Sequence, residues 1–182
     1  DASSSIDGKE FVLQREGYVA ALRHPDFIRA VQAGRHGRIA ITYFEWGRTP
    51  RPASWVRWTV IDGPDSAAAF ARQVLSRPLY RAGGTSISAA ITHGSLLFLN
   101  AFEGDRKVID VSGDGVNSMG DPVEEARDRA VRDGVVINGL PIINERQFTW
   151  GLPNLKELDL YYRDCVIGGP GAFFIVAEDF AT

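Results

Sequence analysis

The sequence has few of the residues that build disulfide frameworks and zinc sites. Its 182 residues include one cysteine, Cys165, and three histidines. A single thiol cannot close a disulfide within the chain and excludes a zinc site made of several cysteines. His24, His36 and His93 show no H-E-x-x-H spacing, so we expect them in the core or at the surface and predict no zinc site.

A long apolar run and an excess of positive charge are also missing. The uninterrupted apolar stretches are short, as at residues 135–137, whereas a transmembrane helix needs about 20 apolar residues. Lysine and arginine number 20 against 23 aspartates and glutamates, a formal net charge of −3. A mildly acidic chain gives no electrostatic reason to bind nucleic acid. We therefore expect neither nucleic-acid binding nor membrane insertion by this segment.

The motifs of several common enzyme classes are absent. The chain has no G-x-S-x-G, which marks the nucleophile turn of α/β-hydrolases, and no G-x-x-x-x-G-K-[ST] phosphate-binding loop. Its glycine-rich stretch at residues 168–171 precedes a predicted strand and is interpreted as a turn. The sequence alone therefore favours a protein that is not an enzyme.

The composition that is present is that of an ordinary globular domain. Hydrophobic residues make up 45% and charged residues 24% of the chain. A chain of this length corresponds to one domain, which we assign to residues 1–182.

Local patterns predict an alternation of helices and strands. The segment at residues 38–46 is rich in β-branched and aromatic residues, which favours a strand. A short connection to the next strand predicts an antiparallel hairpin at a sheet edge. From about residue 86, helices and strands alternate as in right-handed βαβ units on a largely parallel sheet. Helices are predicted at residues 9–22, 26–31, 63–76, 87–102, 121–133 and 154–163, and strands at 38–46, 54–61, 106–111, 135–140 and 172–177.

Three polar segments open helices or follow strands, where ligands bind in open α/β sheets. They are residues 1–5, 83–86 and 112–115, and they supply two carboxylates and several hydroxyls. Ser3 and Ser5 are two residues apart, a spacing that points both hydroxyls the same way in an extended loop. Such hard oxygen ligands suit Mg²⁺, Mn²⁺ or Ca²⁺.

The same residues carry a resemblance to a known family. Asp1-x-Ser3-x-Ser5, Thr85 in a Gly-Gly-Thr loop and Asp114 in an Asp-Gly after a strand resemble the metal-ion-dependent adhesion site (MIDAS) of von Willebrand factor A (vWA) domains. Longer strings resemble one bacterial branch, the DUF1194 family. They lie at residues 11–17, 58–62, 108–115, 137–141 and 161–173.

The resemblance implies an α/β fold of the Rossmann-like, doubly wound kind. Its central sheet would be mostly parallel, with one antiparallel edge strand and helices on both faces. Ser3, Ser5 and Thr85 would ligate the metal directly, and Asp1 and Asp114 would bind it directly or through water. A carboxylate from an Asp or Glu of a partner protein would complete the octahedron. The family also implies an extracytoplasmic, periplasmic location.

One departure from the family concerns the chain ends. The family has an apolar first strand directly before the D-x-S-x-S loop, whereas this sequence begins at Asp1. We therefore expect a fragment truncated at both ends, with its first strand upstream and its closing helix cut.

Several further residues carry expectations of their own. Asp110 is expected to be buried in mid-strand with a structural partner, and Asn117 to stabilise a turn. Glu45 is expected either behind the metal site or in a surface salt bridge. Phe148 and Trp150 follow a strand end, in a loop of the kind that flanks the site, and aromatic residues favour interfaces. We predict that this loop tunes the choice of partner.

Together these features predict a divalent-metal-dependent, adhesion-type protein-binding module. Two alternatives stay open. A metal held by two aspartates could support hydrolysis, although no general base stands beside it in the sequence, so a Mg²⁺-dependent hydrolase of the same fold class is the first. The second is a structural domain with a vestigial metal site.

Overall fold

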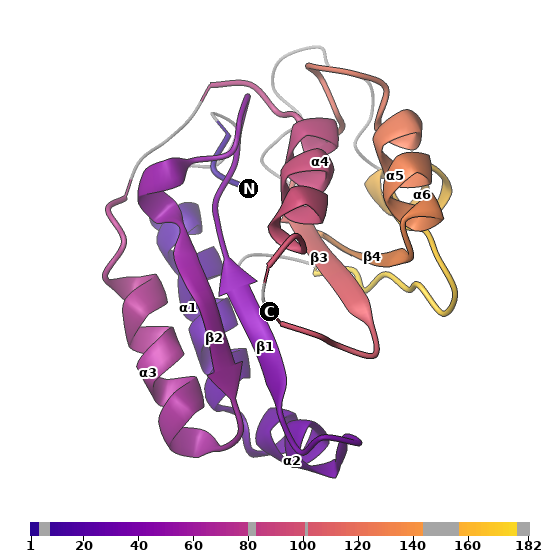
Figure 1. Ribbon diagram of the computed structural model, residues 1–182. Helices are drawn as coiled ribbons and strands as arrows, with labels where there is room; N and C mark the ends of the chain where they lie inside the picture. Colours follow the sequence, from indigo (N-terminus) through magenta and orange to yellow (C-terminus); the bar gives the residue numbers. More distant parts are fainter. Residues whose placement is uncertain (4–7, 80–82, 101, 144–156, 178–182) are drawn as a thin grey trace.

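The computed structural model describes residues 1–3, 8–79, 83–100, 102–143 and 157–177 (Figure 1). Helices and strands follow one another in a mixed order. The elements are α1 (Gly8–Arg23), α2 (Pro25–Ala33), β1 (Ile39–Tyr43), the 3₁₀ helix η1 (Pro52–Ser54), β2 (Val56–Ile61), α3 (Pro64–Leu75), α4 (Ile87–Leu97), β3 (Lys107–Gly113), α5 (Val123–Arg132), β4 (Val135–Pro141), α6 (Leu158–Tyr161) and the π-helical turn η4 (Tyr162–Val166).

The first half of the chain forms an antiparallel pair of strands packed on helices. Ile39 pairs with Ile61 and Tyr43 with Val56, and the register shifts once between them. Helices α1 and α3 pack on this pair, because α3 turns a buried stripe that includes Phe70 toward it. The predicted hairpin at residues 38–61 is thereby confirmed.

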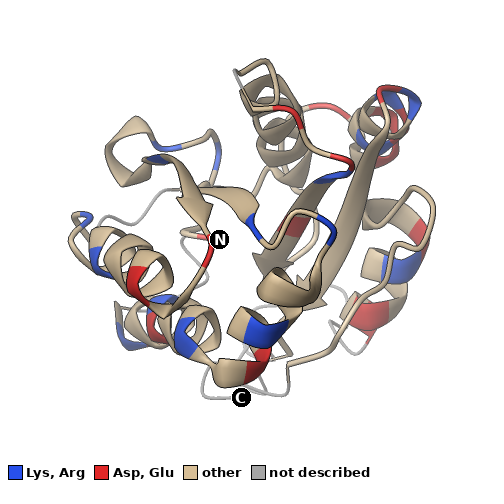
Figure 2. Cartoon of the chain, turned by 60° about the horizontal axis from the view of Figure 1, so that its bottom comes forward, with Lys and Arg blue, Asp and Glu red and all other residues tan. Residues whose placement is uncertain are grey.

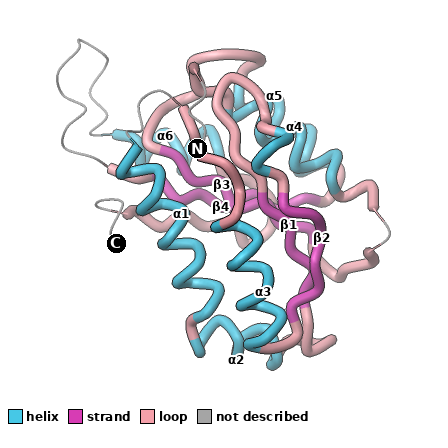
Figure 3. Tube along the Cα trace, turned by 90° about the vertical axis from the view of Figure 1, so that its left-hand side faces the viewer, coloured by secondary structure: helices cyan, strands magenta, loops and turns pink. Residues whose placement is uncertain are grey.

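The second half forms a parallel pair. β3 and β4 run in register from Lys107 opposite Val135 to Gly113 opposite Pro141. Residues 172–177 run beside β4 and the residue after it. Two isolated parallel bridges pair Phe174 with Gly139 and Ala177 with Ile142, so the predicted last strand is paired but is not a continuous strand. Helices α1 and α3 lie on one side of the strands, and α4 and α5 lie on the other (Figure 3).

The sequence predicts a single sheet, whereas the described residues form two smaller ones. β1–β2 and β3–β4 are separate two-stranded sheets among the described residues. Backbone hydrogen bonds of the N-terminal residues reach both. The Asp1 nitrogen donates to Ser112 O at 3.2 Å, and the Ala2 nitrogen donates to Trp46 O at 2.6 Å. Residues 1 and 2 therefore join the end of β3 to the segment that follows β1.

Some predicted boundaries were wrong. The helix expected to reach residue 102 ends at Leu97, where Phe98 N turns back onto Ser95 O at 3.2 Å. The strand predicted to reach residue 46 ends at Tyr43, beyond the register shift. Of the helix predicted at 154–163, the described part is α6 followed by the π turn. No helix in the described part of the chain is long and apolar enough to cross a bilayer.

Candidate metal centre

Asp1 and Ser3 lie in the interior. Their residues are 5% and 1% exposed, and the Ser3 backbone nitrogen donates to Asp1 Oδ1 at 2.7 Å. This local hydrogen bond curls the segment, as aspartate side chains commonly do in turns. Together with the bonds of residues 1 and 2 to both halves of the fold, it fixes the first two predicted ligands beside the end of β3.

Thr85 is held between two other loops. Its carbonyl accepts hydrogen bonds from the backbone nitrogens of Ser118 at 2.9 Å and Met119 at 3.1 Å. On the other side, Ser86 N donates to Gly47 O at 2.9 Å. Ser86 also caps α4, because its Oγ accepts from Ala89 N at 3.2 Å.

Asp114 follows β3 directly and is fully buried. Its neighbour Gly113 allows a close approach that no side chain would permit. A Cβ on Gly113 would lie 2.9 Å from the Tyr162 hydroxyl and 3.0 Å from Asp1 Oδ2. The Asp1 segment and the Asp114 loop are therefore packed against one another through this glycine.

A second glycine shapes the neighbouring loop. Gly120 has φ +82°, which favours glycine, and a Cβ there would lie 2.7 Å from Ser86 Oγ and 3.0 Å from Ser88 Oγ. Asn117 anchors the same loop, because its Oδ1 accepts from Ser88 N at 3.0 Å and its Nδ2 donates to Asp121 O at 3.0 Å. The predicted turn role of Asn117 is confirmed.

The polar groups at this place fit a hard divalent cation. Asp1 Oδ2 is buried and has no hydrogen-bond partner among the described residues. A buried carboxylate oxygen is costly without a partner, and a cation supplies one. The predicted ligands supply carboxylate and hydroxyl oxygens, which suit Mg²⁺, Mn²⁺ or Ca²⁺. The described residues include no metal-holding group of three or more His, Cys, Asp and Glu side chains, so a site here depends on hydroxyls.

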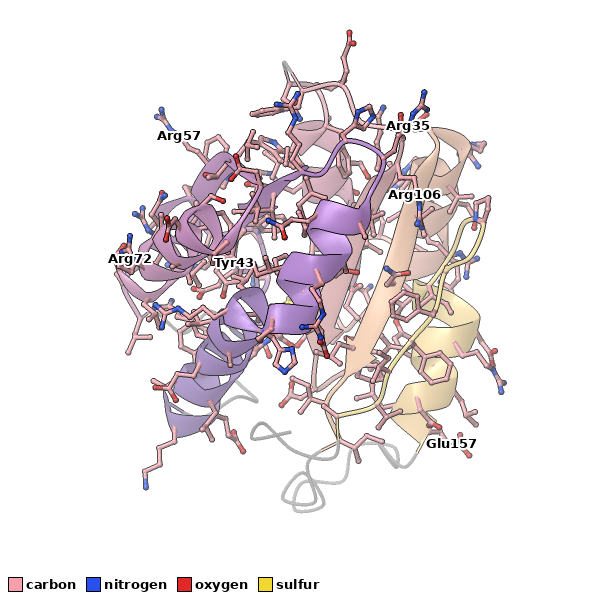
Figure 4. The ribbon with its side chains drawn as sticks, turned by 90° about the horizontal axis from the view of Figure 1, so that it is seen from below. Arg35, Tyr43, Arg57, Arg72, Arg106 and Glu157 are labelled. Atoms are coloured by element: carbon pink, nitrogen blue, oxygen red, sulfur yellow. The ribbon has the colours of Figure 1, made fainter. Side chains whose placement is uncertain are left out.

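Behind these loops lies a buried ion pair. Glu45 Oε1 accepts from Arg15 Nε at 3.0 Å, from Arg15 Nη2 at 2.6 Å and from the Tyr43 hydroxyl at 2.8 Å. Both charged side chains are only 4% exposed, so the predicted surface salt bridge of Glu45 was wrong. Tyr43 points into the interior, whereas Arg57 and Arg72 lie at the periphery (Figure 4). Burial, followed by the charge of Glu45, raises the pKa of Tyr43 well above its ordinary value.

Helix α1 contacts the same segment through Gln14. The amide fits best with its nitrogen donating to Asp1 O at 2.9 Å and its oxygen accepting from Ser112 Oγ at 2.9 Å. Sequence reasoning missed Gln14, Arg15 and Tyr162. For Gln14 and Arg15 the sequence offers a weak signal. They lie one helical turn after the buried Phe11, on the helix that follows the D-x-S-x-S loop, and so share its face.

Tyr162 is the remaining polar group at this place. Burial, followed by the Asp114 carboxylate, raises the pKa of its phenol well above the ordinary value, so the hydroxyl keeps its proton. Tyr162 OH has no hydrogen-bond partner among the described residues. It therefore faces the loops as a donor.

Other predicted residues have separate outcomes. Ser5, Phe148 and Trp150 lie outside the described residues. Asp110 has its partner, Asn138 Nδ2 at 2.8 Å, but the expectation that it is buried was wrong. Asp110 is exposed, and together with Tyr18 of α1 it lines a cavity of about 200 Å³.

Comparison with protein families decides the assignment. The family described as "Protein of unknown function (DUF1194)" matches residues 1–182. The chain belongs to the DUF1194 family. Among curated proteins, none matches this DUF1194 chain.

Solved structures share the fold of the DUF1194 chain at low sequence identity. Proximal thread matrix protein 1 from the mussel byssus has a TM-score of 0.67 and 13% identity, covering 100% of this chain and 42% of that one. The same protein "with zinc occupied MIDAS motif" has a TM-score of 0.60 and 17% identity, over 78% and 36%. The pilus adhesin SpaC from Lactobacillus rhamnosus GG has a TM-score of 0.64 and 12% identity, over 93% and 26%. The DUF1194 chain thus has a vWA-like fold and spans less than half the length of these proteins.

Proposed function

We propose that this DUF1194 chain is a divalent-metal-dependent protein-binding module of the adhesion type. The observation that carries the proposal is the buried Asp1 Oδ2, which lacks a partner among the described residues. It lies where the end of β3 meets the Asp1–Ser3 segment. The vWA-like fold adds support, since one structure of this fold has a zinc-occupied MIDAS motif.

The proposed ligands are Asp1, Ser3, Ser5, Thr85 and Asp114. The hydroxyls of Ser3, Ser5 and Thr85 provide neutral oxygens, and the two aspartates provide the negative charge. A bound Mg²⁺, Mn²⁺ or Ca²⁺ would supply a Lewis-acidic position open to one further oxygen ligand. Because neutral hydroxyls leave a cation short of negative charge, the favoured partner group is the carboxylate of an Asp or Glu on another protein.

The proposal includes the fold and the location. We assign residues 1–182 to one domain with a single doubly wound sheet, to which both strand pairs belong. The bonds from Asp1 to Ser112 and from Ala2 to Trp46 support this assignment, because they connect the β3–β4 pair with the segment that follows β1. A periplasmic location fits an adhesion-type role. Phe148 and Trp150 are proposed to contact the partner without contributing to the metal site.

Metal-linked stability tests the proposal. A ligand that binds only the folded protein raises stability by about 2.7 kcal/mol at 100 times its dissociation constant. We expect Mg²⁺ or Mn²⁺ to raise the unfolding temperature of the wild type and to leave that of Asp114→Asn unchanged. The matched control is Asp128→Asn, on the exposed face of α5, which should respond like the wild type. A wild type whose unfolding temperature ignores both ions, measured by differential scanning calorimetry, would contradict the proposal.

A further inference from the structure

Tyr162 is a fully buried tyrosine whose hydroxyl has no hydrogen-bond partner in the described part of the chain. It opens the π-helical turn η4, directly after α6. Ile167 N donates to Tyr162 O at 2.9 Å, the i to i+5 bond that defines this turn. π-Helical turns are rare, and those that occur are often found at functional sites. The turn fixes where the Tyr162 ring points.

The ring lies across two glycines on neighbouring strands. A Cβ on Gly139 of β4 would lie 2.7 Å from Tyr162 Cδ1, and a Cβ on Gly113 of β3 would lie 2.9 Å from the hydroxyl. Gly139 is in register with Val111, two residues before Gly113, so both glycines are on one face of the sheet. Because neither glycine has a side chain, a groove is left that holds the Tyr162 ring. The hydroxyl therefore lies beside Gly113, the residue directly before Asp114.

A second unpartnered oxygen lies at the same glycine. Asp1 Oδ2 is 3.0 Å from the position of a Gly113 Cβ and, like the Tyr162 hydroxyl, is buried without a partner. One group is a hydrogen-bond donor and the other is an acceptor. A phenylalanine would fill the groove equally well, and an unpaired buried hydroxyl costs stability. An unpaired hydroxyl kept at this cost points to a polar role beside the Asp1 carboxylate.

We propose that Tyr162 is a positioning residue of the metal centre. When the metal binds, its hydroxyl donates a hydrogen bond to Asp1 Oδ2, while Asp1 Oδ1 stays bonded to Ser3 N. The carboxylate is then held at both oxygens and keeps one orientation toward the cation. This inference rests on the proposed function, because it requires that Asp1 belong to a metal site.

The test compares Tyr162→Phe with the wild type in the intact protein, using Mn²⁺ alone as the probe. Loss of a hydrogen bond to a ligating group typically lowers metal affinity by 10–100-fold, and we expect a rise in the Mn²⁺ dissociation constant of about tenfold by calorimetric titration. In EDTA, we expect the unfolding midpoint of Tyr162→Phe to equal or exceed that of the wild type, because the variant removes an unpaired buried hydroxyl.

Tyr43→Phe is the matched control. Its hydroxyl is paired with Glu45 Oε1 at 2.8 Å, so its removal should lower the midpoint in EDTA and leave Mn²⁺ affinity unchanged. In an Asp1→Asn background, the Tyr162→Phe effect on Mn²⁺ affinity should shrink, because both changes act on one hydrogen bond.

Each other result is decisive. Wild-type Mn²⁺ affinity in Tyr162→Phe overturns the role of Tyr162 and leaves the proposed function standing. A lowered midpoint in EDTA with unchanged affinity shows that the hydroxyl serves folding alone, and it overturns the inference in the same way. A wild type that binds no Mn²⁺ overturns both proposals.

Discussion

At the scale of single residues, Gly113 is a tightly packed position of the candidate site. A methyl group there would meet both the Tyr162 hydroxyl and Asp1 Oδ2. We predict that Gly113→Ala lowers stability by about 1–3 kcal/mol, the usual cost of overpacking, and abolishes the metal-linked rise in unfolding temperature. Thermal unfolding with and without Mg²⁺ measures both effects.

Gly115 provides the control for this prediction. It is two residues further along the same loop, and a Cβ there would meet nothing within 4 Å. Gly115→Ala should therefore keep both the stability and the metal response of the wild type. Equal behaviour of the two alanine variants would show that the approach at Gly113 does not matter for the site.

Arg15 and Glu45 form the buried ion pair behind the site. Removing one partner of such a pair leaves an uncompensated charge, which typically costs about 3–5 kcal/mol. We predict a loss of this size for Arg15→Met in urea unfolding. Combining it with Glu45→Gln should recover part of the loss, because the stranded carboxylate is then removed.

An exposed pair shows the contrast. Arg29 and Asp26 form an ion pair on α2 with both side chains mostly exposed. Surface pairs contribute about 0.2–1 kcal/mol, so Arg29→Ala should change little. If Arg15→Met cost no more than Arg29→Ala, burial of the Arg15–Glu45 pair would not be an important source of stability.

At the scale of the elements, α4 positions Thr85 through its capped N-terminus. Ser86 Oγ accepts from Ala89 N at 3.2 Å, and loss of such a cap costs about 1 kcal/mol. We predict that Ser86→Ala lowers the free energy of unfolding by about this amount and leaves the Mn²⁺ dissociation constant unchanged. Ser76→Ala, at an exposed helix end, is the control and should be near neutral. Loss of Mn²⁺ binding in Ser86→Ala would instead make Ser86 a ligand.

Most elements could be predicted from local sequence, and their ends could not. The β-branched run at residues 39–43 and the strand at 135–141 gave clear signals. The end of α4 at Leu97 could not be predicted, because residues 98–102 remain apolar enough to continue a helix. The pairing of residues 172–177 depends on β4, which is distant in sequence, so a strand was predicted where the structure has isolated bridges.

The candidate site divides in the same way. The carboxylates and hydroxyls at residues 1, 3, 85 and 114 stand in motifs whose spacing is visible in the sequence. Tyr162 and Arg15 have no such spacing. They reach the site through a groove made by two glycines and through a helix face, and both are properties of packing between distant segments.

At the scale of the whole molecule, the described residues form two large hydrophobic cores and a smaller third cluster that includes Ala2 and Phe11. The two large cores have different elements. One gathers α1, α2 and α3 with β1 and β2, and the other gathers α4, α5, β3, β4 and η4. Basic and acidic residues are interspersed over the helices that cover them (Figure 2), in keeping with the small net charge of −3. Residues 1–3 and the loops around Thr85 connect the two halves.

This arrangement predicts how a metal changes protection from hydrogen exchange. Regions with few connecting contacts open locally at low free energy, and a ligand that bridges them raises that free energy. We expect Mg²⁺ or Mn²⁺ to slow exchange in β1 and β3 together, measured by mass spectrometry of peptic fragments. Slowing in one half alone would contradict a site built from both halves. Asp114→Asn serves as the control and should show no slowing.

The hydrogen bonds of Asp1 and Ala2 to opposite halves have a mechanical consequence. These two residues belong to the segment that carries the first two proposed ligands, Asp1 and Ser3. Tension that pulls the halves apart would therefore load the proposed ligands, and an ion bound by them would stiffen the contact between the halves. Resistance of the protein to pulling and binding of the ion would then depend on the same contacts.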